Sequence, residues 1–75
     1  MLQAIVISKE YFTKRQAENW MRNHPEFKQI KAMHETIHTY GFRLRQPSEK
    51  FDYRMKTLTT GVKAVIGFLP YALYD

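Results

Sequence analysis

The sequence has no cysteine and no long apolar run, and each absence excludes a class of protein. Without cysteine there is neither a disulfide nor a thiolate metal site, which fits a reducing compartment. No segment approaches the roughly 20 apolar residues of a membrane-spanning helix. The apolar start, residues 1–7, is too short for a signal-peptide core and lacks a basic flank. We therefore expect a protein that is neither secreted nor membrane-bound.

Glycine and proline are scarce, at three residues each, whereas 44% of the 75 residues are hydrophobic. This composition predicts a folded core rather than disorder. A chain of this length makes one domain. Such a domain buries only about 60% of its unfolded surface, so its stability margin is thin. We expect the domain to occupy residues 1–69 and an apolar C-terminal tail to occupy residues 70–75.

Acidic residues are fewer than basic ones, 7 against 12, and the formal net charge is +5. Residues 42–63 hold six cations against Glu49 and Asp52, and six minus two gives +4 in this segment alone. A basic surface attracts nucleic acid, anionic lipid or acidic proteins without distinguishing them. The placement of the charge therefore points to a binding surface on the second half of the chain.

The first third of the chain predicts a strand followed by a helix. Residues 2–8, LQAIVIS, contain no turn residue and are apolar on both faces, which is typical of a central strand. Thr13 is a good helix N-cap, and Gln16 three residues later completes a capping box. Phe12 and Ala17 occupy the positions of a hydrophobic staple.

Helical spacing gives this helix one apolar face, and Pro25 ends it near residues 23–24. We interpret Trp20 and Met21 as core residues, and His24 as a residue that caps the last carbonyl groups. The face consists of Ala17, Trp20, Met21 and His24.

Residues 26–38 allow two interpretations. Phe27, Ile30, Met33 or His34, and Ile37 are spaced like one face of a second helix, which Pro25 could begin at its first turn. Alternatively, residues 28–34 form a strand with Ile30 and Ala32 inward and a turn near residues 35–37. Periodicity alone does not decide between them.

The remaining sequence predicts three strands. Apolar and basic residues alternate in residues 38–46 and again in residues 51–58, and residues 47–50 form a loop between them. Residues 59–61 form a turn in which Gly61 supplies a positive φ, and residues 62–67 form the last strand. The fold class is therefore α+β, one helix on a small, mostly antiparallel sheet in the order β-α-β-β-β-β, with the last strands arranged as a meander.

Two segments of the sequence are distinctive, the Phe42-Arg43-Leu44-Arg45-Gln46 strand and the final heptapeptide, residues 61–67 (GVKAVIG). They occur together with Phe12-Thr13, Ala17, Trp20, Asn23-His24 and Arg54. Over about residues 2–67, this set resembles a small family of proteins from tailed-phage and giant-virus genomes. Members of this family also occur beside or fused to phage head-morphogenesis proteins such as prohead proteases.

The resemblance implies a viral protein, located in the host cytoplasm or the virion, and favours strands over a second helix in residues 28–46. It carries no defined activity. The chain departs from the family at Pro25-Glu26, where glycine is usual, and at His34-Glu35-Thr36, where an acidic turn is common.

His34-Glu35-Thr36-Ile37-His38 matches the H-E-x-x-H signature of zinc metalloproteases. The chemistry requires a helix, because two histidines on one zinc bring their nitrogens within about 4 Å of each other. In a strand, residues four apart are separated by about 13 Å. We interpret the match as coincidental and a zinc hydrolase as a minor alternative. We expect no catalytic residue, no metal, no cofactor and no enzymatic activity.

The candidate binding residues are five cations that alternate with apolar neighbours: Arg43, Arg45, Arg54, Lys56 and Lys63. If they share the sheet face away from the helix, like charges across strands disfavour folding unless an anionic partner or acidic neighbours offset them. Bound to nucleic acid, they would neutralise phosphates. An ordinary solvated face is the alternative. Tyr40, Phe42 and Tyr53 alternate with the cations, so we interpret them as core residues.

We predict a small viral binding module whose basic sheet face contacts nucleic acid. The alternative is a virion-associated or host-directed protein-interaction module, with an acidic protein partner or with homo-oligomers. The second reading draws on the apolar residues of the C-terminal segment, which suit an interface. They are Phe68, Leu69, Tyr71, Leu73 and Tyr74.

Overall fold

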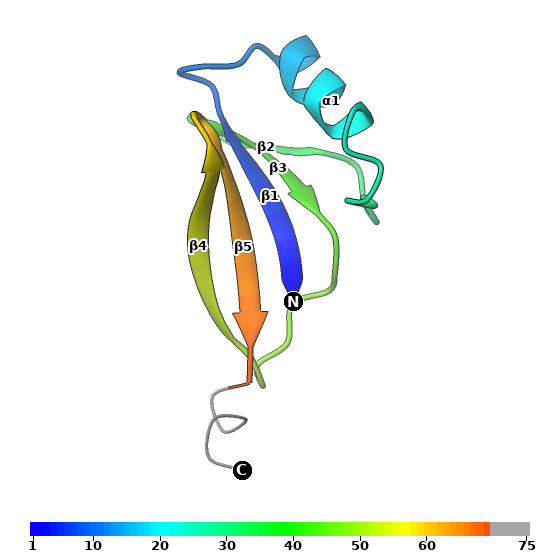
Figure 1. Cartoon of the computed structure of the whole chain (residues 1–75), viewed down its shortest axis with the longest axis vertical. Coiled ribbons are helices and arrows are strands. Elements are labelled where there is room, and N and C mark those ends of the chain that lie inside the picture. The colour runs from blue at the N-terminus through cyan, green and yellow to red at the C-terminus, as the bar shows by residue number, and fades with distance from the viewer. Residues whose placement is uncertain (70–75) are drawn as a thin grey trace.

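One helix packs on one face of a five-stranded antiparallel sheet in this computed structural model, which describes residues 1–69 (Figure 1). The α+β class and the order β-α-β-β-β-β are those that the sequence predicts. The elements are β1 (Leu2–Ser8), α1 (Lys14–Arg22), β2 (His34–Glu35), β3 (Thr39–Arg43), β4 (Asp52–Thr59) and β5 (Val62–Phe68).

The strands lie side by side in the order β2-β3-β1-β5-β4, and all neighbours are antiparallel. The expectation that β1 is central is confirmed. The expected meander is wrong, because β1 lies between β3 and β5 and separates them. The physical reason is that β1 is apolar on both faces, and a strand of this kind is best covered in the middle of a sheet.

The core lies between α1 and the middle of the sheet. Ile5 of β1 lies opposite Phe42 on one side and Ala64 on the other, and Ile7 lies opposite Tyr40 and Val62 in the same way. All of these residues are buried, as are Ala17 and Met21 on the inner side of the helix. Full burial of one such large side chain stabilises the fold by roughly 1.5–3 kcal/mol.

The ends of α1 follow the sequence closely. The Thr13 hydroxyl accepts a hydrogen bond from the Gln16 backbone N–H at 3.2 Å, and the Thr13 backbone N–H donates to the Gln16 side chain at 2.9 Å. The capping box is therefore confirmed. Beyond the last helical residue, His24 Nδ1 lies 2.6 Å from the Trp20 carbonyl oxygen, and the two rings stack with centroids 3.8 Å apart. His24 thus caps the helix, and Trp20 is partly buried beside the core.

Residues 26–33 form neither the second helix nor a full strand, and only His34–Glu35 joins the sheet. Ile30 and Ile37 are 47% and 84% exposed, so neither the helical face nor an inward Ile30 exists. Ala32 is exposed as well. The segment instead lies along β3, where the Ile30 N–H donates to the Arg43 carbonyl at 2.9 Å. Only Phe27 and Met33 pack against the core.

The turn between β4 and β5 is the one that the sequence predicts. Gly61 has a φ of +82°, a conformation that side chains rarely adopt. A Cβ atom there would also lie 2.8 Å from Tyr11 Cβ. Within residues 1–69, no helix has the length and apolar character to cross a membrane.

Candidate nucleic-acid interface

The five candidate cations lie on two faces of the sheet rather than one. Arg43 lies opposite Ala4, and Lys63 lies opposite Val6. Ala4 and Val6 alternate with the buried residues of β1, so Arg43 and Lys63 occupy the face opposite α1, here called the open face. This part of the prediction agrees with the register.

Arg54 and Lys56 lie on the other face. They pair with Ile66 and Ala64 of β5, and Ala64 belongs to the core beneath α1. The expectation that all five cations share one face is therefore wrong. The reason is that β4 is an edge strand with all eight residues exposed, so the helix-side positions of β4 meet water and can carry charge. Arg45 follows β3 in a loop.

Tyr53 lies on the open face together with Arg43 and Lys63, and this was not expected. It pairs with Gly67. Successive residues of β5 alternate between the two faces of the sheet, and Ala64 lies in the core beneath α1. Gly67, three positions later, therefore lies on the open face. Tyr40 and Phe42 are buried as predicted, whereas Tyr53 is 36% exposed. Its interpretation as a core residue is wrong, because β4 directs its apolar side chains away from the helix.

The Tyr53 ring is held in a fixed position. A Cβ atom on Gly67 would lie 2.8 Å from Tyr53 Cε1, so the ring rests directly on the glycine backbone. The Tyr53 hydroxyl accepts a hydrogen bond from the Ser48 N–H at 2.7 Å and donates to the Ser48 carbonyl at 3.2 Å. Phe51 lies beside it, with ring centroids 6.4 Å apart. The open face thus presents an aromatic ring whose orientation is set before any ligand arrives.

Beside Tyr53, the open face carries two rows of side chains that include both cations. Met55, Val65, Ala4 and Arg43 form one row across β4, β5, β1 and β3. Thr57, Lys63, Val6, Gly41 and His34 form the next row, across all five strands. At about 4.8 Å between strands, the first row spans about 14 Å from Met55 to Arg43.

Arg43 also lines a hollow of about 410 Å³ beside strands β2 and β3. Lys31 and His34 line the same hollow, so two further basic side chains lie near Arg43. Sequence reasoning missed Lys31 because residues 26–33 have no period from which a face could be assigned. His34 was considered only as part of the zinc motif.

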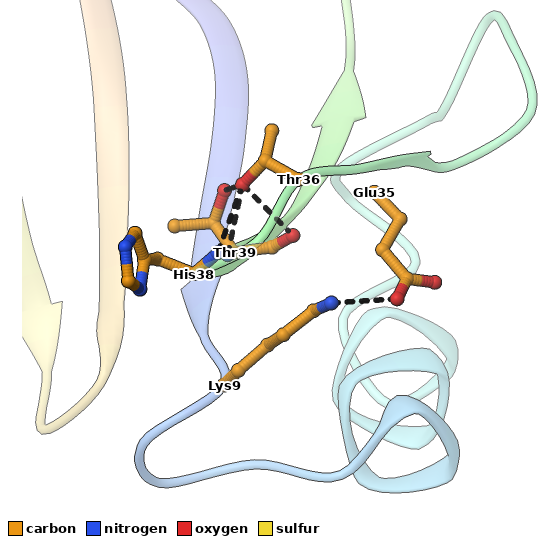
Figure 2. A network of polar contacts seen from close by, with 5 residues as sticks. All are labelled: Lys9, Glu35, Thr36, His38 and Thr39. Atoms are coloured by element: carbon orange, nitrogen blue, oxygen red, sulfur yellow. Dashed lines mark hydrogen bonds and ion pairs between the residues drawn. The ribbon is translucent and has the colours of Figure 1, made fainter.

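That motif does not form the helix that the zinc signature requires. His34 and Glu35 belong to strand β2, and Thr36, Ile37 and His38 form the turn into β3. Figure 2 shows that Glu35 is directed to Lys9, whose ammonium lies 2.6 Å from the carboxylate. The turn is closed by the Thr36 hydroxyl, which accepts from the His38 and Thr39 backbone N–H groups at 3.3 and 3.0 Å. The pentapeptide therefore forms strand β2 and the turn of the β2–β3 hairpin.

The apolar C-terminal segment is described only in part. Phe68 is the last residue of β5 and is half-buried, and Leu69 is 46% exposed. The other proposed interface residues, Tyr71, Leu73 and Tyr74, lie outside the described residues.

The chain matches no family model, no curated protein and no solved structure. The resemblance to the phage and giant-virus family therefore stays a prediction drawn from the residues.

Proposed function

We propose that this chain binds single-stranded nucleic acid through the open face of its sheet. The observation that carries the proposal is the fixed, partly exposed Tyr53 ring on the same face as Arg43 and Lys63. Binding of single strands without strong sequence preference typically combines aromatic rings, on which bases stack, with basic groups that follow the phosphates. The viral origin implied by the resemblance is part of the same proposal.

Each group has a defined role in this proposal. Tyr53 provides the stacking surface, and its contacts with Ser48 and Gly67 hold the ring in one orientation. Lys63, within the second row, and Arg43, at the end of the first row, neutralise phosphates. Lys31 extends the positive charge into the hollow beside Arg43. A shallow sheet suits unstacked bases better than a duplex, whose bases are accessible only from its grooves.

The test is fluorescence anisotropy with labelled single-stranded DNA and RNA and the matching duplexes, titrated at two salt concentrations. We expect single strands to bind more tightly than duplexes and the affinity to fall as salt rises. The variant Arg43→Glu/Lys63→Glu should lose at least about tenfold in affinity. Tyr53→Leu, which keeps the apolar contact with Gly67, should weaken binding by roughly 1–3 kcal/mol if one base stacks there.

The chain offers a matched control in Arg54→Glu/Lys56→Glu. It has the same change of net charge, but the charges lie on the opposite face of β4. A much smaller loss in this control would locate the site on the open face. Equal losses in both variants would contradict a defined site and indicate general charge attraction. No binding at low salt would reject the proposal and favour the alternative protein-interaction module.

A further inference from the structure

Among residues 1–69, the outer edge of β4 is the longest unpaired backbone in the sheet. β4 has eight residues, all exposed, and within this part of the chain it pairs only with β5. The opposite edge, β2, has two residues, and very short edge strands are one way in which proteins avoid edge-to-edge pairing. Residues 52–59 contain no proline, and the irregularity of β4 lies only between Thr57 and Thr59. The stretch from Asp52 to Thr57 is therefore regular and open to a further strand.

The hydrogen bonds of Gly67 reveal which backbone groups of β4 are free. The Gly67 N–H donates to the Met1 carbonyl at 2.8 Å, and the Gly67 carbonyl accepts from the Met1 amino group at 2.7 Å. Both groups of Gly67 thus face β1, and its partner Tyr53 cannot exchange hydrogen bonds with it. In an antiparallel ladder bonded and non-bonded pairs alternate. The backbone groups of Tyr53, Met55 and Thr57 therefore face outward.

We propose that two copies of this chain pair through their β4 edges, antiparallel and about a two-fold axis at Arg54. The side chains of β4 are complementary to themselves in this register. Asp52 of each copy lies opposite Lys56 of the other, which gives two pairs of opposite charge. Tyr53 of each copy lies opposite Met55 of the other, which covers a side chain that is 56% exposed in the single chain. Aromatic–thioether contacts of this kind are favourable.

The backbone geometry supports the same register. Tyr53 and Met55 are the residues with outward-facing groups, so they form the hydrogen-bonded pairs between the copies. Asp52 and Lys56 then form the non-bonded pairs, in which Cα atoms approach to about 4.5 Å and the side chains are closest. The opposite charges therefore meet at the closest positions across the interface.

One like-charge pair remains, Arg54 against Arg54 on the axis. The guanidinium of Arg54 lies over the Phe68 ring, 5.3 Å from its centroid, and is thus drawn toward β5 of its own chain. This position lowers the repulsion across the axis. The sequence of β4 is complementary to itself through Asp52 and Lys56, and binding to an unrelated protein would not require this. A second copy of the chain is therefore the partner that the pattern of charges favours.

The pairing would join two sheets into one of ten strands with both open faces on the same side. It goes beyond the proposed function, because it needs no nucleic acid.

Sedimentation equilibrium of the full chain without nucleic acid, from micromolar to millimolar concentration, tests the proposed pairing directly. We expect a monomer–dimer equilibrium in the wild type. A monomer at every concentration would overturn the inference whatever the result for nucleic acid.

Two variants locate the interface. Asp52→Lys places like charges opposite each other twice and should raise the dimer Kd by about tenfold or more. The charge exchange Asp52→Lys/Lys56→Asp restores both attractive pairs at the wild-type net charge and should restore the wild-type Kd. All substituted positions are exposed, and circular dichroism confirms folding. A dimer that is unaffected by Asp52→Lys, or that the exchange fails to restore, would overturn the assigned register.

Met55→Pro provides a backbone test. Proline lacks the N–H that faces outward at this position, and proline is tolerated on edge strands where this group points to solvent. We expect the variant to stay folded and to be monomeric at the concentrations at which the wild type dimerises. A folded Met55→Pro dimer would overturn pairing through this edge.

Discussion

At the scale of single residues, Glu35 of the H-E-x-x-H match contributes to the fold through an ion pair with Lys9. The Lys9 ammonium donates a hydrogen bond to the Glu35 carboxylate, and the positive charges of Lys9 and Lys14 add to the effect. Together they lower the pKa of Glu35 below its ordinary value of 4.5. The pair ties the connection after β1 to the short strand β2, which has few other contacts to hold it in the sheet.

This shift predicts a pH-dependent stability. A carboxyl group whose pKa is lower in the folded chain stabilises the fold above its unfolded pKa, and the effect disappears as pH falls through the folded pKa. Glu35→Gln should therefore slightly lower the Tm at pH 7. The difference from wild type should shrink as pH falls below the ordinary pKa and should vanish only below the lowered pKa of the folded chain. Thermal melts followed by circular dichroism across this range measure it.

A suitable control is Glu49→Gln, because Glu49 makes no ion pair within residues 1–69. It should show no comparable pH-dependent difference. A Glu35→Gln difference that persisted unchanged at low pH would mean that the ion pair is not its cause.

At the scale of elements, α1 depends strongly on its N-terminal cap. The helix has only nine residues, and isolated helices of this length are marginal in water. Thr13→Ala removes the acceptor for the Gln16 N–H and should cost about 1 kcal/mol of unfolding free energy. Urea denaturation measures the loss. Thr13→Ser or Thr13→Asp should preserve most of the stability, and an equal loss in all three would indicate that packing rather than capping is responsible.

The sequence predicts α1 well because its signals are local. Thr13, Gln16 and Pro25 act within one or two turns, so no distant residue is needed to interpret them. The faces of β4 are different. Alternation in residues 52–57 shows that two faces differ, but which of them meets α1 depends on where β4 lies in the sheet. In a strand that the helix does not cover, a charged side chain can lie on the helix side of the sheet and an aromatic side chain on the other side. Lys56 and Tyr53 are placed in this way.

Residues 26–33 illustrate another limit. Phe27, Ile30 and Met33 have apolar side chains at helical spacing. Such spacing predicts a helix only when the tertiary structure buries all the residues of that face. Here the helix leaves room for Phe27 and Met33 but not for Ile30, which remains exposed. Tertiary packing therefore decides this segment, and with it the position of Lys31 beside Arg43. That part of the candidate site could not be predicted from the sequence.

At the scale of the whole molecule, the core is small enough that one side chain controls it. Phe42 is 2% exposed and lies opposite Ile5 in the middle of the sheet. Phe42→Ala should cost about 3–5 kcal/mol, which is comparable to the whole stability of a domain at the lower end of the usual 5–15 kcal/mol. We expect a largely unfolded variant by circular dichroism. Ile37→Ala, at an 84% exposed position, is the control and should melt like the wild type. A cooperative melt of Phe42→Ala close to the wild-type Tm would show that the core lies elsewhere.

The strand order could not be predicted from the sequence, because no residue pattern within a strand identifies the strand with which it pairs. The β4–β5 hairpin could be predicted from Gly61 and its flanking alternation. The insertion of β1 between β3 and β5 depends on residues more than 30 positions apart, and only the two apolar faces of β1 indicated a central place.

The central place of β1 also governs when the chain can fold. β1 precedes the strands β2 to β5 along the chain, yet one of its two neighbours, β5, begins at Val62, and Met1 bonds to Gly67 across 66 positions of sequence. Until β5 has been synthesised, an apolar strand lacks half of its hydrogen-bond partners and is open to pairing with other chains. Closing so long a loop also slows folding relative to proteins with local contacts. The native sheet therefore cannot assemble before β5 has been synthesised, and nascent chains that end before Val62 carry an aggregation-prone strand.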